Sequence, residues 1–271
     1  TTRFGVIGLI YLVLLSDLEV VGACFSIRTK SPASRLFLDT AVESEWDELL
    51  PLGIFHGITT NPTLLERAKQ PCTVSNIQRM AHRALSHPNC EEFMCQAWGE
   101  TAQELYETGL QLATTIPNVV NDQVVIKVPV TAEGTKAASM LIQSNVRVCL
   151  TACYTSHQAL IAASVGAEYL APYLGRMDDA GKDGADEILA MQQIVDSFSA
   201  HRHGNKGTNN NNDEETSVGR TRIFVASIRS VSSMVELAAK GLDTFTFSPD
   251  IARALFNSEP LTIQAANDFE P

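Results

Sequence analysis

A lysine in the middle of an apolar stretch is the feature of the sequence with the clearest chemical potential. Lys127 lies between Ile126 and Val128 in residues 123–130, a run typical of a buried strand. Burial lowers the pKa of a lysine, and a neutral amine attacks carbonyl groups to form a Schiff base. Alternatively, Lys127 lies on an edge strand and faces solvent, which Pro129 favours because proline prefers sheet edges. The residue alone does not decide between the two.

The elements around Lys127 predict how it would be positioned. Eight short apolar or β-branched runs cover residues 35–40, 56–61, 92–98, 123–130, 146–152, 168–174, 221–228 and 243–248. Helical periodicity lies between them, as in residues 105–116 and in residues 232–241, where Gly241 is a suitable C-cap. Eight strands, each followed by a helix, predict a single α/β domain with the parallel (β/α)8 fold of a TIM barrel.

In such a barrel the active-site residues lie at the carboxyl ends of the strands. Polar residues occupy these positions on seven of the eight predicted strands. They are Asp39, Thr59, Asn61, Gln96, Lys127, Thr151, Tyr173, Ser227 and Arg229. Strand ends are generally polar, so several of these would occur by chance. Their convergence on one mouth nevertheless favours a catalytic role for the buried lysine.

Five motifs resemble those of the transaldolase family. They are FLDTA (37–41), GITTNPT (57–63), KVPVTAEG (127–134), AEYLAPYLGRMDD (167–179) and VASIRS (225–230). The resemblance extends from about residue 35 to 269, and within the family the chain is most similar to the small fructose 6-phosphate aldolases. It implies a Schiff-base enzyme with a sugar-phosphate substrate. It implies neither a metal nor an organic cofactor, because the lysine supplies the electrophile.

The resemblance assigns the central reaction to two residues. Lys127 forms the Schiff base with a ketose phosphate, and the protonated imine accepts the electrons of the breaking C3–C4 bond. Asp39 matches the aspartate that exchanges a proton with the C4 hydroxyl, a task suited to a carboxylate. Taken alone, Asp39 favours the structural alternative, the N-cap of a helix in residues 39–46.

Asn61 and Thr59 match the strand-two motif of the family, where these residues contact the substrate and the surroundings of the lysine. A turn into the next helix, directed by Pro62, is the structural alternative, and both interpretations can hold together. Arg176 and Ser227, with Arg229 assisting, resemble the phosphate site. A guanidinium offers two parallel hydrogen bonds to a phosphate and supplies local positive charge on an acidic protein.

Four positions bear on whether the resemblance implies an aldolase or a transaldolase. Transaldolases orient a water with a strand-three glutamate and a strand-five threonine, and here these positions hold Gln96 and Thr151. Tyr173 replaces a phenylalanine, Cys149 an asparagine and Ala171 a serine. All four replacements favour cleavage of fructose 6-phosphate. The alternatives are transfer of dihydroxyacetone from sedoheptulose 7-phosphate to glyceraldehyde 3-phosphate, as in the pentose phosphate pathway, and a silent sugar-phosphate-binding protein.

Composition excludes several other classes of function. The 271 residues include 31 acidic and 20 basic side chains, giving a net charge of −11 that opposes nucleic-acid binding. No GxGxxG motif follows a strand, no HExxH motif occurs, and the six cysteines form no CxxC pair. We therefore expect no metal site, free thiols and a cytoplasmic enzyme that binds neither nucleic acid nor membranes.

Two segments fall outside the barrel pattern. Residues 1–34 contain a twelve-residue apolar run at 4–15, which is too short to span a bilayer. A signal peptide would fit this run, but Asp17 and Glu19 oppose it, and an extension of the domain is the favoured interpretation. Residues 199–219 are rich in Asn, Gly and charge and predict a flexible surface loop inserted in the barrel domain. That domain covers the rest of the chain, and the family resemblance implies a homo-oligomer.

Overall fold

The computed structural model describes residues 34–114, 122–203, 221–256 and 259–270. The N-terminal extension expected over residues 1–34 lies outside this part of the chain, apart from Ser34. A helix continues to His203, so its end covers the first five residues of the segment expected to be a loop. Residues 204–219 of that segment are outside the described residues.

Eight parallel strands form a closed barrel, as the sequence predicts, and each strand pairs with its neighbours in chain order. The strands are β1 (Arg35–Asp39), β2 (Phe55–Thr59), β3 (Glu92–Gln96), β4 (Val124–Pro129), β5 (Arg147–Cys153), β6 (Tyr169–Pro172), β7 (Arg222–Val225) and β8 (Thr244–Phe247). β1 pairs with both β2 and β8, which closes the sheet and leaves no edge strand. The TIM-barrel prediction is confirmed.

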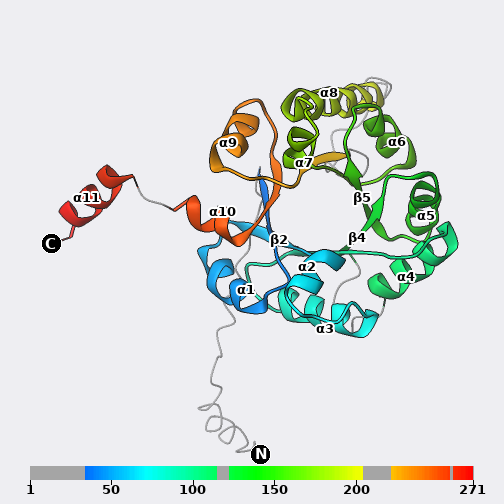
Figure 1. Ribbon diagram of the computed structural model, residues 1–271, viewed down its shortest axis with the longest axis horizontal. Coiled ribbons are helices and arrows are strands. Elements are labelled where there is room, and N and C mark those ends of the chain that lie inside the picture. The colour runs from blue at the N-terminus through cyan, green and yellow to red at the C-terminus, as the bar shows by residue number, and fades with distance from the viewer. Residues whose placement is uncertain (1–33, 115–121, 204–220, 257–258, 271) are drawn as a thin grey trace, which may run out of the picture. The chain divides into compact units, whose positions relative to one another are not determined.

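Helices surround the barrel, and most lie between consecutive strands (Figure 1). They are α1 (Glu43–Leu49), the 3-10 helix η1 (Leu50–Leu52), α2 (Pro62–Arg67), α3 (Val74–Leu85), α4 (Ala102–Thr114), α5 (Ala132–Gln143), α6 (His157–Val165), α7 (Leu174–Asp179), α8 (Gly184–His203), α9 (Val231–Ala239), α10 (Pro249–Ala254) and α11 (Pro260–Asp268). The predicted helix stop holds, because α9 ends just before Gly241, whose φ of 98° suits glycine.

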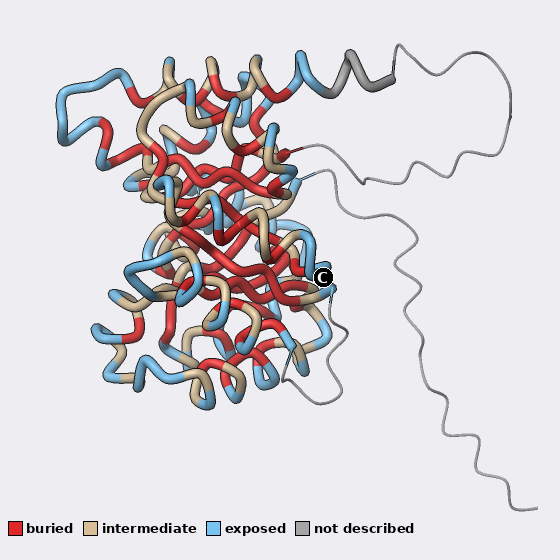
Figure 2. Tube along the Cα trace, turned by 90° about the vertical axis from the view of Figure 1, so that its right-hand side faces the viewer, coloured by how far each residue is buried: buried red, intermediate tan, exposed pale blue. Residues whose placement is uncertain are grey.

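The strands are buried on both faces, which explains their nearly continuous apolar sequences (Figure 2). Side chains alternate along each strand, so one set packs against the helices and the other fills the barrel interior. On β4, Ile126 and Val128 belong to the large core beneath the helices, whereas Val125 belongs to the interior cluster. Lys127 shares the parity of Val125 and therefore points into the barrel.

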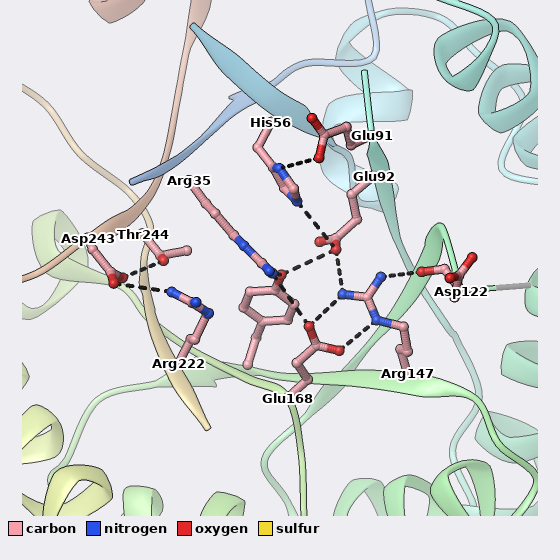
Figure 3. Close-up of polar contacts among 11 residues, drawn as sticks. Arg35, His56, Glu91, Glu92, Asp122, Arg147, Glu168, Arg222, Asp243 and Thr244 are labelled. Carbon is pink, nitrogen blue, oxygen red and sulfur yellow. Dashed lines mark hydrogen bonds and ion pairs between the residues drawn. The ribbon is translucent and has the colours of Figure 1, made fainter. Parts of the chain in front are cut away.

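A network of charged side chains closes the end of the barrel where the strands begin (Figure 3). Arg147, the first residue of β5, contacts Glu92 and Glu168 at 2.5 Å each. Arg35, the first residue of β1, donates to the Tyr169 hydroxyl and lies 3.5 Å from Glu168. This end of the barrel interior is therefore occupied by paired charges.

Five of the six cysteines lie in the described part of the chain. Cys90, Cys95, Cys149 and Cys153 are free and buried, as expected, whereas Cys72 is free but exposed, and Cys24 lies outside the described residues. Within the same part of the chain, no helix is long and apolar enough to cross a membrane.

Candidate active site

Lys127 is buried near the carboxyl end of β4, with 2% of its surface exposed. In the strand register it lies beside Gln96 on β3 and Cys149 on β5. Because the barrel is closed, the alternative of a solvent-facing lysine on an edge strand does not apply. The lysine is a cation inside the barrel, at the end opposite to the charged network.

The charges around Lys127 change one expectation from the sequence. Burial lowers the pKa of its ammonium, but the facing acidic groups of Tyr173 and Asp39 raise it, and the net direction is upward. The prediction of a lowered pKa was therefore wrong for the free site, because sequence shows burial but not the acids that converge on the amine. A nucleophilic amine requires that Lys127 first passes a proton to another group.

Asp39 ends β1 and accepts a hydrogen bond at 2.6 Å from the hydroxyl of Thr59, its register partner on β2. It does not cap the following helix, because α1 has Val42 at its N-cap and no side chain bonds the cap. The helix-cap alternative is therefore not realised. The carboxylate instead lies on the inner side of the barrel, where Lys127 is one of its electrostatic partners.

Asn61 follows β2 and caps α2, with its side-chain oxygen accepting from the backbone N–H of Leu64 at 3.1 Å. Pro62 occupies the first position of that helix, where a missing N–H costs nothing. The structural interpretation of this motif is thus confirmed. The amide N–H2 of Asn61 has no partner among the described residues, so it remains able to donate to a ligand.

Tyr173 follows β6, and its hydroxyl forms a 3.0 Å hydrogen bond with the hydroxyl of Thr151 on β5. Its ring packs edge-on against Tyr154 at 5.8 Å and lies beneath the guanidinium of Arg176 at 5.9 Å. These contacts fix the phenol on three sides. Tyr173 also forms an isolated β-bridge with Ala226, directly after β7, which joins the tyrosine to the segment that carries the predicted phosphate ligands.

Two small side chains lie inside the barrel near the lysine. Cys149 and Ala171 are fully buried in the interior apolar cluster, beside Tyr169 and Phe224. Burial raises the pKa of Cys149 to about 12, although Lys127 opposes the shift. The thiol therefore stays protonated near neutral pH and acts as an apolar neighbour, not as an acid or base.

An open cavity of about 610 Å³ contains the residues expected to bind phosphate. Its lining residues are Arg67, Arg176, Asp179, Ala180, Ser227 and Arg229. Ser227 has a φ of 59°, and its carbonyl accepts from the Gly175 backbone N–H at 3.0 Å. The three cations concentrate positive charge on one surface of an otherwise acidic protein, which suits an anionic ligand.

The arginines of this cavity differ in their partners. Arg229 is exposed and forms a two-pronged ion pair with Asp179, which neutralises much of its charge. Arg67, at the end of α2, is exposed and has no ion pair among the described residues. Arg67 was not predicted from the sequence. Its position within two turns of the Asn61 helix cap is the sequence signal that could have identified it as a residue near the mouth of the barrel.

A second missed residue is Thr246 on β8. Its hydroxyl lies 2.8 Å from that of Thr59, although the two residues are 187 positions apart in the chain. Both threonines are buried, at 0% and 1% exposure for Thr59 and Thr246.

Among the described residues, no group of three His, Cys, Asp or Glu side chains is arranged to hold a metal ion.

Comparisons with known proteins identify relatives that are similar over most of the chain. The family described as transaldolase/fructose-6-phosphate aldolase matches residues 36–270. The chain is 30% identical over 237 residues to the probable transaldolase of Phenylobacterium zucineum strain HLK1, covering 87% of this chain and 94% of that protein. The probable transaldolase of Brucella melitensis biotype 1 is also 30% identical, over 235 residues, with the same coverage.

Among solved structures, a thiamine phosphate pyrophosphorylase from Pyrococcus furiosus is similar with a TM-score of 0.50 and 13% identity. The match covers 82% of this chain and 92% of that chain. At this identity the likeness concerns the barrel fold and not the reaction, since one fold hosts many chemistries.

Proposed function

The chain belongs to the transaldolase/fructose-6-phosphate aldolase family, and from this premise we propose that it is a Schiff-base aldolase. It cleaves the C3–C4 bond of fructose 6-phosphate to dihydroxyacetone and glyceraldehyde 3-phosphate, and it catalyses the reverse addition. The observation that carries the proposal is the buried Lys127, which faces Asp39 and Tyr173 inside the barrel. A buried lysine that interacts at longer range with a carboxylate and a phenol is suited to forming an imine once its amine has lost a proton.

Imine formation begins with a proton transfer, because Lys127 rests as an ammonium ion. Once the amine has lost a proton to a neighbouring group or to water, its nitrogen attacks the C2 carbonyl of the ketose. The carbinolamine then loses water, and a protonated imine remains. Tyr173 is our candidate for exchanging protons in this step, since its phenol is one of the acidic groups that interact with Lys127.

Bond cleavage follows from the positive charge of the imine. Asp39 takes the proton of the C4 hydroxyl, a carbonyl forms at C4, and the electrons of the C3–C4 bond move into the imine to give an enamine. Glyceraldehyde 3-phosphate leaves at this point. The second oxygen of Asp39 has no hydrogen-bond partner among the described residues, which leaves it able to accept this proton.

The fate of the enamine separates the aldolase from the transaldolase. In the aldolase, an acid protonates C3 and water then hydrolyses the imine to release dihydroxyacetone. Tyr173 is our candidate for this acid, because a phenol donates a proton and a phenylalanine does not. Its hydrogen bond to Thr151 at 3.0 Å orients the hydroxyl. Gln96 and Ala171 complete the pattern that favours the aldolase.

Transaldolase activity is the second candidate, because the relatives at 30% identity are named probable transaldolases. In that reaction the enamine waits for an aldose acceptor and adds to its carbonyl. Both reactions use Lys127 and Asp39 in the same way up to the enamine. The residues around Tyr173 are therefore the part of the site that the two proposals interpret differently.

The phosphate of the substrate would bind in the arginine-lined cavity. Arg176 and Ser227 are its first ligands in the proposal, and Arg229 assists in spite of its ion pair with Asp179. Arg67 adds a fourth polar group and a charge that no described acidic residue neutralises. Two or more guanidinium groups around one phosphate provide charge-assisted hydrogen bonds of the stronger kind.

The deciding experiment measures glyceraldehyde 3-phosphate release from fructose 6-phosphate, with and without erythrose 4-phosphate. Release without the acceptor supports the aldolase, and release only with the acceptor supports the transaldolase. Lys127→Met should abolish both activities and the borohydride-trapped adduct. Tyr173→Phe should lower cleavage about 10²-fold, as expected for a lost general acid. Unchanged cleavage by Tyr173→Phe would refute the role of the phenol, and trapping without cleavage would mean a different sugar.

A further inference from the structure

A chain of hydrogen bonds leads from β8 through β2 to Asp39. The Thr59 hydroxyl donates to Asp39 Oδ1 at 2.6 Å, and the Thr246 hydroxyl lies 2.8 Å from Thr59 Oγ1. These three residues come from strands that are adjacent around β1. Their side chains all face the barrel interior, and both threonines are almost completely buried.

The direction of this chain follows from counting protons. A hydroxyl has one hydrogen to donate, and a carboxylate only accepts. Thr59 uses its hydrogen on Asp39, so the contact between the two threonines requires Thr246 to donate and Thr59 to accept. The chain therefore runs from Thr246 to Thr59 to Asp39, and each donor polarises the next one toward the carboxylate.

The Thr246 hydroxyl has no other hydrogen-bond partner in the described part of the chain. Two positions earlier on β8, Thr244 is equally buried, but its hydroxyl donates to Asp243 at 2.7 Å. The two threonines thus lie on the same strand, are both buried and both face the barrel interior, but their hydroxyls lead to different carboxylates. Thr246 leads through Thr59 to Asp39, at the mouth of the barrel.

We propose that Thr246 is a positioning residue for Asp39, acting through Thr59. This inference rests on the proposed function, in which Asp39 removes the proton of the substrate hydroxyl. With Thr246 donating, Thr59 has one orientation that satisfies all of its hydrogen bonds, and Asp39 Oδ1 is fixed by it. The other carboxylate oxygen is then held where it can take the proton. Without Thr246, Thr59 can rotate and Asp39 can turn with it.

The test compares Thr246→Val, which keeps the shape and removes the hydroxyl, with Thr246→Ser, which keeps the hydroxyl. We expect Thr246→Val to lower kcat for cleavage about tenfold, since small misplacements of a catalytic group have effects of this order. KM should change less than about twofold, because the phosphate ligands are untouched. Thr246→Ser should retain a kcat close to that of the wild type, and Thr244→Val is the matched control with unchanged kcat.

Two further measurements separate positioning from a general loss of structure. Borohydride trapping of Lys127 with dihydroxyacetone should proceed equally well in Thr246→Val and the wild type, because imine formation precedes the step of Asp39. The double variant Thr59→Val/Thr246→Val should be no slower than Thr59→Val alone, because Thr246 acts only through Thr59. Thr246→Ala, which adds no volume, serves in place of the valine variant if that variant does not fold.

Several outcomes would overturn the proposal. Equal kcat values for Thr246→Val and Thr244→Val would show that the hydroxyl has no special role. Equal losses in Thr246→Ser and Thr246→Val would assign the effect to packing. Loss of trapping in Thr246→Val would place the defect at the lysine. If the wild type cleaves or transfers no sugar phosphate, the proposed function fails first, and the positioning role fails with it.

Discussion

Replacing Glu92 with glutamine tests how much of the stability of the barrel comes from the charged network at its closed end. The Glu92 side chain is 2% exposed, and its Oε2 accepts from Arg147 at 2.5 Å and from the Tyr169 hydroxyl at 3.2 Å (Figure 3). His56 lies 3.8 Å from the same oxygen. Glutamine keeps the shape of the side chain and removes its charge, so packing is unchanged and the electrostatic contribution is isolated.

The expected loss follows from what Arg147 retains. Removing one charge of a buried pair costs about 3–5 kcal/mol when the other charge is left without a partner. Here Arg147 keeps two hydrogen bonds to Glu168, at 2.5 and 2.6 Å, so we expect the lower end, about 3 kcal/mol. For a domain of this size, that lowers Tm by about 6–12 °C.

The assay is thermal unfolding followed by circular dichroism at pH 7 and one scan rate. Glu91→Gln is the matched control, because Glu91 is the neighbouring carboxylate, is 39% exposed and lies 3.4 Å from His56. We expect a change of at most about 1 kcal/mol for this partly exposed contact. Equal Tm shifts for the two variants would refute the reasoning. The kcat of Glu92→Gln at 25 °C should match the wild type, since the network lies away from the mouth.

The pKa of Glu92 predicts how the stability difference between the wild type and Glu92→Gln changes with pH. Burial raises the pKa of Glu92, but His56 and Arg147 lower it, and the net direction is below the ordinary value of 4.5. Such a group contributes stability that is fully present above its unfolded pKa and is lost as the pH falls through the folded pKa. The Tm difference between the wild type and Glu92→Gln should therefore be full at pH 7 and shrink below about pH 4.5. A difference that grows on acidification would contradict this.

Two predictions concern the phosphate cavity. Arg67→Ala should raise KM for the sugar phosphate about tenfold with little change in kcat, because it removes binding common to substrate and transition state. The control is Arg83→Ala, which removes an exposed arginine on α3. Equal KM values for these two variants in steady-state kinetics would exclude Arg67 from the site. In Gly175→Ala the new Cβ would lie 2.6 Å from Arg229 Nε and from the Ser227 carbonyl. It should therefore raise KM for phosphorylated acceptors in the aldol addition and leave unphosphorylated aldehydes unaffected, and a parallel loss with both would contradict the assignment.

Local sequence patterns predicted most of the fold. The eight strands were recognisable because burial on both faces leaves continuous apolar runs, such as residues 123–130 around Lys127. The barrel closure was less local, since it depends on β1 pairing with β8 across most of the chain. That closure removes the edge strands, and with them the solvent-facing alternative for Lys127 that Pro129 supported.

The candidate site was predictable where a residue has one chemical use and ambiguous where it has two. Asp39 suited a helix cap as well as a general base, and only the long-range contact with Thr59 separated these possibilities. Asn61 does cap its helix, so its local pattern predicted the cap correctly but gave no information about a ligand. Thr246 and Glu92 escaped notice because a single threonine or glutamate on a strand has no local signature.

The two ends of the barrel differ in how completely their buried charges are paired, and this difference bears on function. Arg147 at the closed end has two carboxylates within 2.5 Å. Lys127 is more deeply buried, yet no described carboxylate lies within the 4.0 Å of an ion pair, and it interacts with Asp39 only at longer range. The acidic groups that face Lys127 at longer range raise the pKa of its ammonium, so its positive charge is stabilised without a direct ion pair. In the proposed reaction Lys127 must become neutral and bond to carbon, and a carboxylate in direct contact would hold its proton and occupy the space of the substrate.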